Sequence, residues 1–141
     1  MYLDSAYIVK YYVNEPGSAG VRELVHQAES RTSSALAIPE VACALHRLRR
    51  EGYLAEDLFQ EARTNFLKHV EMGAWSMLPV NDRVLQRVSR MLSLAPAVLY
   101  LRSGDAIHLA TAVEAGEVEV WTNDRHMIAA APHFGLTGRS A

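Results

Sequence analysis

At 141 residues the chain has the length of one domain, and half of its residues are hydrophobic while about a fifth are charged, as in ordinary globular proteins. A formal net charge of −2 excludes a strongly basic nucleic-acid-binding protein, although a local basic patch would still suffice to bind RNA. We therefore expect a single domain over residues 1–141. Cys43 is the only cysteine, so no internal disulfide forms, and its apolar neighbours predict a small buried side chain. No cationic start precedes a long apolar run, which predicts a cytoplasmic protein without a secretory signal or a membrane span.

The chain begins with a short apolar stretch that runs into an acid and a hydroxyl. Tyr2 and Leu3 predict a strand, and Asp4 and Ser5 follow at its carboxyl end, where chemistry collects in open α/β sheets. Asp4 is also suited to be the N-cap of the apolar helix over residues 6–13. A functional role for Asp4 therefore depends on whether other acids reach the same edge.

Helices and short strands alternate along the rest of the chain, which predicts right-handed parallel crossovers. The expected elements are, in order, a helix around 21–28, a strand at 32–36, helices over 39–50 and 55–72, a strand at 75–80, a helix around 84–92, a helix opening at 103, a strand at 118–121, a short helix from 125 and an edge strand at 134–136. The helices over 39–50 and 55–72 form an αα-hairpin, a natural docking surface for a partner. The second of them should bury one apolar face, made of Leu58, Phe59, Ala62, Phe66, Leu67 and Val70.

The helix over 39–50 carries both an acid and the most basic stretch of the chain. Pro39 suits its first position, and Glu40 lies in its first turn, where the helix dipole favours an acid whatever its role. Arg47 follows seven residues later and projects from the same side as Glu40. Arg47, Arg49 and Arg50 are either a solvated helix end or a set of phosphate contacts.

Two further acids stand at element junctions in the second half of the chain. Asp105 lies in the first turn of a helix for which Ser103 is a fair N-cap, and His108 follows one turn later. A single histidine there is expected in the core or as a hydrogen-bond partner of a site residue, rather than as a ligand. Asp124 comes directly after the strand at 118–121 with Thr122 before it, which repeats the opening pattern of strand, hydroxyl and acid.

Asp4, Glu40, Asp105 and Asp124 are best interpreted together, whereas Asp82 is interpreted as a helix cap. If the first and fourth strands are both interior, these four acids face one crevice. Two carboxylates ~4 Å apart repel by about 4 kcal/mol at an effective dielectric near 20, so the acids must share protons or hold a cation. An all-oxygen site without a Cys–His pairing favours Mg²⁺ or Mn²⁺ over zinc. Such an ion activates water and suits phosphodiester hydrolysis.

Four segments, in order and over nearly the full length, resemble the motifs of PIN-domain proteins and are most similar to VapC toxins of toxin–antitoxin pairs. They are residues 2–18, residues 38–41 with the arginine-rich helix that follows, residues 103–112 and residues 121–125. Ala6 stands where serine is common in the family, which leaves the four acids untouched. The resemblance implies an α/β/α sandwich around a central parallel sheet of four to five strands.

The resemblance also implies an Mg²⁺- or Mn²⁺-dependent endoribonuclease toxin. Asp4, Asp105 and Asp124 become the metal ligands by position, and Glu40 orients the attacking water or completes a second metal position. The hydroxyls that would hydrogen-bond these acids are those of Ser5 and Thr122. The family further implies a homodimer and a small antitoxin whose tail occludes the acidic groove.

The candidate RNA contacts are Arg47, Arg50, Arg102 and Arg125. A catalytically silent PIN-fold binding or dimerisation module is the alternative, but its signature would be the loss of one or more acids, and all four are present. A phosphatase or receiver-like protein is disfavoured, because Ala6 occupies the position that an Asp-x-Asp pattern requires.

Overall fold

The computed structural model describes residues 1–141 and contains one five-stranded sheet. All strand pairs are parallel, in the order β3-β2-β1-β4-β5. The strands are β1 (Tyr2–Leu3), β2 (Thr32–Ser34), β3 (Ser76–Leu78), β4 (Glu119–Trp121) and β5 (Thr137–Arg139). β1 lies at the centre and β4 beside it, so the expected parallel sheet with two interior acid-bearing strands is confirmed.

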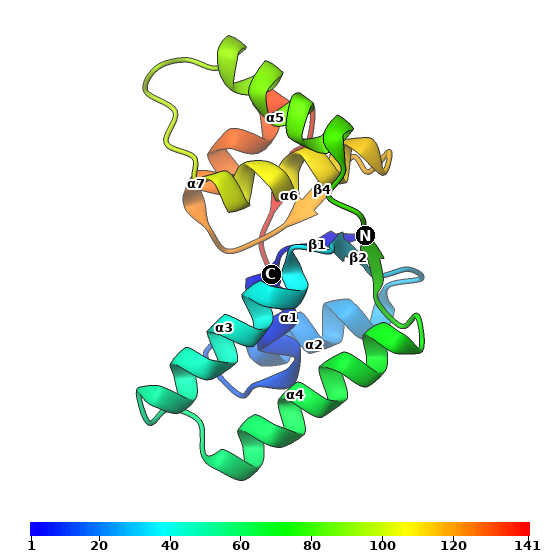
Figure 1. Ribbon diagram of the computed structural model, residues 1–141, viewed down its shortest axis with the longest axis vertical. Coiled ribbons are helices and arrows are strands. Elements are labelled where there is room, and N and C mark those ends of the chain that lie inside the picture. Colours follow the sequence, from blue (N-terminus) through cyan, green and yellow to red (C-terminus); the bar gives the residue numbers. More distant parts are fainter.

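Helices cover both faces of the sheet and make three layers (Figure 1). One face carries α1 (Ser5–Tyr12), α2 (Ser18–Gln27), α3 (Ala37–Arg50) and α4 (Glu56–Glu71). The other carries α5 (Asp82–Leu94), α6 (Ser103–Glu114), α7 (Arg125–Ala130) and the 3₁₀ helix η1 (Ala131–Phe134). None of these helices combines the length and hydrophobicity that a membrane crossing requires.

Each layer has its own hydrophobic core, and β1 contributes to both. Leu3 packs among the helices α1 to α4, whereas Tyr2 packs among α5 to α7, because successive strand side chains point to opposite faces. Both side chains are fully buried. The backbone N–H of Asp4 donates to the carbonyl of Trp121, so pairing with β4 continues to the acid. The first acid is thus fixed to a rigid sheet.

Several element boundaries and helix caps differ from the expected ones. α3 begins at Ala37, so Pro39 is its third residue, still within the first turn where a helix N–H has no partner. Arg102 rather than Ser103 occupies the N-cap position of α6. Asn81, not Asp82, caps α5, since the side chain of Asn81 accepts from the backbone N–H of Val84.

The edge strand expected at 134–136 is wrong, because β5 begins at Thr137. Phe134 ends η1, and Gly135 follows with a φ of +77°, a left-handed conformation that ends the 3₁₀ helix. Phe134 and Leu136 are buried in the core of the α5–α7 layer. The apolar residues Phe134 and Leu136 on either side of Gly135 gave the local pattern of a strand, but in the structure they anchor a turn.

Three side chains are more exposed than expected. Cys43 is exposed rather than buried, since it lies on the side of α3 that lines a pocket. Leu58 and Leu67 of α4 are 50% and 40% exposed. The buried stripe of α4 is narrower than its full apolar set and is formed by Phe59, Ala62 and Phe66. The expected αα-hairpin of α3 and α4 is present.

Candidate active site

Asp4 is both a helix cap and a pocket residue, so its two interpretations are compatible. Its Oδ1 accepts a hydrogen bond from the backbone N–H of Tyr7 at 2.9 Å, which caps α1. Its Oδ2 accepts from the hydroxyl of Thr122. The residue is only 6% exposed, and this burial raises the pKa of Asp4 above its ordinary value against the opposing effect of the two hydrogen bonds.

Thr122 links the two aspartates that follow strands. Its hydroxyl donates to Asp4 and accepts from the backbone N–H of Asp124 at 2.9 Å. Asp124 in turn caps α7, because its Oδ1 accepts from the backbone N–H groups of His126 and Met127. One fully buried hydroxyl therefore links Asp4 to Asp124 at the carboxyl ends of β1 and β4.

Asp105 reaches the same place from the first turn of α6 and shares a cation with Asp124. The guanidinium of Arg102 donates through Nε to Asp105 Oδ2 at 3.0 Å and through Nη2 to Asp124 Oδ2 at 2.8 Å. A positive charge thus already bridges two of the four acids. The guanidinium of Arg102 therefore shows that these carboxylates attract a cation.

Glu40 comes from the first turn of α3 and is half-buried. Burial by itself would raise its pKa, but the hydrogen bond that His108 donates, with Ser5 and Arg102 contributing, holds the pKa of Glu40 below its ordinary value. The distance from His108 Nε2 to Glu40 Oε2 is 2.8 Å. Gly104 passes so close that a Cβ at this position would lie 2.9 Å from Glu40 Oε1.

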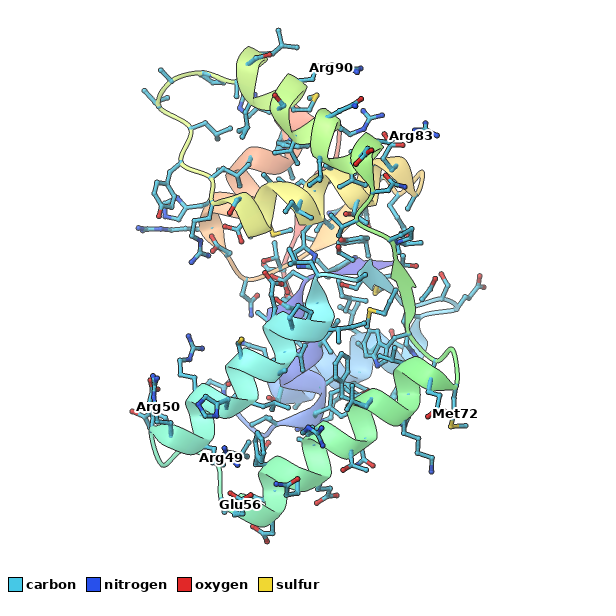
Figure 2. The ribbon with its side chains drawn as sticks, viewed as in Figure 1. Arg49, Arg50, Glu56, Met72, Arg83 and Arg90 are labelled. Carbon is cyan, nitrogen blue, oxygen red and sulfur yellow. The ribbon has the colours of Figure 1, made fainter.

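The four acids line one pocket of about 580 Å³ at the carboxyl edge of the sheet. Ser5, Arg47 and Arg102 also line it, whereas Thr122 lies behind Asp4, and Arg50 and Arg125 are not among its lining residues. Figure 2 shows Arg50 at the far tip of the α3–α4 hairpin, where it pairs with Glu51. Two of the four arginines considered for RNA contact are therefore at the pocket.

Sequence reasoning missed several residues of the site. Glu15 and Cys43 line the pocket, but Glu15 lies in a turn and Cys43 in an apolar stretch, so neither carried a signal of its own. Gly104 was part of a recognised motif, yet its close approach to Glu40 depends on packing between α3 and α6. His108 was expected as a partner of a site residue, and its bond to Glu40 confirms that expectation.

The donor set fits a hard divalent cation. All four acids offer carboxylate oxygens, which Mg²⁺ and Mn²⁺ prefer over the nitrogen and sulfur ligands typical of zinc. No group of three or more His, Cys, Asp or Glu side chains is arranged to hold a metal ion in the present conformation. The guanidinium of Arg102 engages the Oδ2 atoms of Asp105 and Asp124, so a metal ion that binds these acids through the same oxygens would displace it.

The fold and the pocket together define an α/β protein with an acid-lined site where the parallel strands end. The sequence profile described as PIN domain matches residues 1–132. The chain belongs to the PIN-domain family, and the resemblance of its four motifs is confirmed.

Two relatives from Mycobacterium tuberculosis align over most of the chain. Ribonuclease VapC46 is 36% identical over 138 residues, which cover 96% of this chain and 93% of that protein. Ribonuclease VapC45 is 31% identical over 130 residues, with 89% and 86% covered. The chain is therefore similar to proteins named as VapC ribonucleases along nearly its whole length.

Two solved structures share the fold at low sequence identity. VapBC2 from Rickettsia felis, bound to a DNA fragment from its promoter, superposes with a TM-score of 0.68 at 12% identity over 99% of this chain and 96% of that one. VapC20 from Mycobacterium tuberculosis, a sarcin–ricin-loop-cleaving toxin, gives a TM-score of 0.67 at 13% identity, covering 92% and 93%. At these identities the likeness shows the fold, an α/β/α sandwich of the PIN type.

Proposed function

We propose that this protein is a VapC-type endoribonuclease toxin that hydrolyses RNA phosphodiester bonds. The observation that carries the proposal is the convergence of Asp4, Glu40, Asp105 and Asp124 from separate elements on one pocket. The relatives named as ribonucleases support the same activity. A silent binding module would have no need to keep four carboxylates together against their mutual repulsion.

The metal in this proposal is Mg²⁺, with Mn²⁺ as a substitute. Asp4, Asp105 and Asp124 would hold it, and the bound ion would activate a water and offset charge that develops on the scissile phosphate. Thr122 fixes the orientation of Asp4 and the backbone position of Asp124, so the two strand-end ligands keep a constant separation. Ser5 adds a hydroxyl beside Glu40.

Glu40 and the arginines have roles separate from holding the ion. Glu40 is kept ionised by His108, so its carboxylate can accept a hydrogen bond from the attacking water and orient it. Arg47 and Arg102 line the pocket and would contact RNA phosphates next to the cleaved bond. Arg50 and Arg125 would reach RNA only outside the pocket.

The proposed partners are a small cognate antitoxin and a second copy of the chain, in the cytoplasm. The toxin–antitoxin resemblance of the sequence and the fold shared with VapBC2 support the antitoxin. The α3–α4 hairpin offers exposed apolar side chains, including Leu58 and Leu67, on which a partner could pack.

The test is RNA cleavage by the purified protein with Mg²⁺, with Mn²⁺ and with EDTA. We expect cleavage with either ion, none with EDTA, and none in Asp105→Asn although this variant stays folded. Asp82→Asn is the matched control, since it removes an exposed acid that does not line the pocket. Full activity in EDTA, or in Asp105→Asn, would overturn a metal-dependent nuclease built on these acids. No cleavage of RNA with either ion would overturn the proposal in favour of the silent module.

A further inference from the structure

His108 uses both ring nitrogens, although it is buried and reaches neither solvent nor the pocket wall. Its Nε2 lies 2.8 Å from Glu40 Oε2, and its Nδ1 lies 3.0 Å from the hydroxyl of Tyr2. The side chain is 3% exposed, and Tyr2 is fully buried. A buried chain of hydrogen bonds therefore leads from the central strand to a carboxylate of the pocket.

The partners of His108 determine which nitrogen carries the proton. The carboxylate of Glu40 only accepts hydrogen bonds, so Nε2 must donate to it. In the neutral ring Nδ1 is then the acceptor, and the phenol of Tyr2 donates to it. Glu40 thus selects the tautomer, and Tyr2 holds the ring in the orientation that points its Nε2–H at Glu40.

The elements that carry the acids also carry the residues of this chain of hydrogen bonds. β1 carries Tyr2 two residues before Asp4, and α6 carries His108 three residues after Asp105, on the same helix face. Glu40 comes from α3, in the opposite helix layer. The bond between His108 and Glu40 therefore ties the carboxylate of one layer to the two elements that deliver Asp4 and Asp105.

We propose that His108, held by Tyr2, is a positioning residue that orients the Glu40 carboxylate for RNA cleavage. The inference rests on the proposed function, since it assigns Glu40 a part in cleavage. Without His108, the half-buried Glu40 side chain would keep its place in the pocket but lose the donor that selects one orientation. The acids proposed to hold the metal would be unaffected.

The test compares three substitutions by their steady-state constants. We expect His108→Ala to lower kcat about tenfold to a hundredfold with little change in KM, the size of effect seen when a hydrogen-bond partner of a site residue is lost. His108→Gln should recover most of kcat, because its amide N–H lies near the position of Nε2. Tyr2→Phe should give a smaller loss, and His133→Ala is the control, an exposed histidine outside the pocket.

Two further measurements separate positioning from a merely structural role. Mn²⁺ should raise the melting temperature of His108→Gln and wild type equally, and ¹⁵N NMR should show the Nε2–H tautomer in wild type and in Tyr2→Phe alike, since the Glu40 carboxylate requires it. A kcat per folded molecule that is unchanged in His108→Ala and His108→Gln would overturn the inference, as would the Nδ1–H tautomer in wild type. If wild type itself fails to cleave RNA, the proposed function fails, and this inference fails with it.

Discussion

The carboxylate of Asp4 is buried, so its charge lowers the stability of the fold although the proposed activity requires it. It lies at the end of the central strand with 6% of its surface exposed, and its burial raises its pKa. A charge in such a place is costly to fold around unless a cation compensates it. Stability does not explain the position, whereas the proposed binding of a metal ion by Asp4 would.

Asp4→Asn should therefore make the metal-free protein more stable and inactive. Asparagine keeps an oxygen for the N–H of Tyr7, and its amide nitrogen can donate to the Thr122 oxygen in place of the bond that Asp4 accepts. The buried charge is removed, so we expect the melting temperature to rise by a few degrees, as about 1 kcal/mol produces in a domain of this size. RNA cleavage should fall by about 10²-fold or more, since each loss of about 1.4 kcal/mol of transition-state stabilisation costs a factor of ten. Thermal melts in EDTA and cleavage assays measure both effects, and a destabilised Asp4→Asn would contradict the first.

The pH dependence of stability follows from the same residue. Between the ordinary pKa of aspartate and the raised pKa of Asp4, the native metal-free protein binds more protons than the unfolded chain, so its stability should fall as pH rises through that window. Glu40 acts oppositely, because its lowered pKa contributes stability above the ordinary glutamate pKa that is lost as pH falls through the lowered value. Urea unfolding at a series of pH values in EDTA measures this dependence, and Asp4→Asn should lose the fall of stability with rising pH. If wild type and Asp4→Asn show the same dependence of stability on pH, Asp4 is not its source.

Arg102 would compete with the proposed metal ion for two acids, because it pairs with both Asp105 and Asp124. Arg102→Ala should therefore bind Mn²⁺ more tightly, by up to about tenfold, a modest gain since the guanidinium is largely exposed and such pairs are weak. Isothermal titration measures this affinity. Arg125→Ala is the matched control, as Arg125 forms no ion pair with either acid. Weaker Mn²⁺ binding by Arg102→Ala would contradict the competition.

At the scale of elements, the helices were predictable wherever an apolar stripe and a breaker agreed. The helix expected over 55–72 is α4 at Glu56–Glu71, ended by Gly73 with positive φ. The strand expected at 134–136 failed because a glycine turn and a strand share the same local apolar pattern. The local sequence pattern also predicts that the acids lie at the ends of elements. It does not predict the close contact of Gly104 in α6 with Glu40 in α3, because that contact depends on how distant elements pack.

Gly104→Ala tests that contact. The added Cβ would lie 2.9 Å from Glu40 Oε1, the mobile end of a side chain, so Glu40 moves and the fold remains. We expect unchanged or slightly higher stability, since alanine favours a helix over glycine by about 0.5–1 kcal/mol, together with slower RNA cleavage. Gly20→Ala in α2 is the control, as nothing lies within 4 Å of its new Cβ. Equal cleavage by both variants would show that the position of Glu40 does not matter.

At the scale of the whole molecule, the order of the strands in the sheet brings the acids of the pocket together. β1 and β4 pair Tyr2 with Val120 and Leu3 with Trp121, residues that are 118 positions apart in sequence. This pairing brings Asp4 and Asp124 to one edge of the sheet. The sequence suggested convergence through parallel topology and the family motifs. It could not supply the register, the bridging hydroxyl of Thr122 or the cation bridge of Arg102, because these depend on contacts between distant segments.

The most direct test of the central claim is a crystal structure with Mn²⁺, in which anomalous scattering locates the ion. The account predicts one peak in the pocket, with oxygens of Asp4, Asp105 and Asp124 at about 2.1 Å and the guanidinium of Arg102 withdrawn from the acids. A structure at saturating Mn²⁺ with no peak among these carboxylates, and with Arg102 still bridging Asp105 and Asp124, would contradict it.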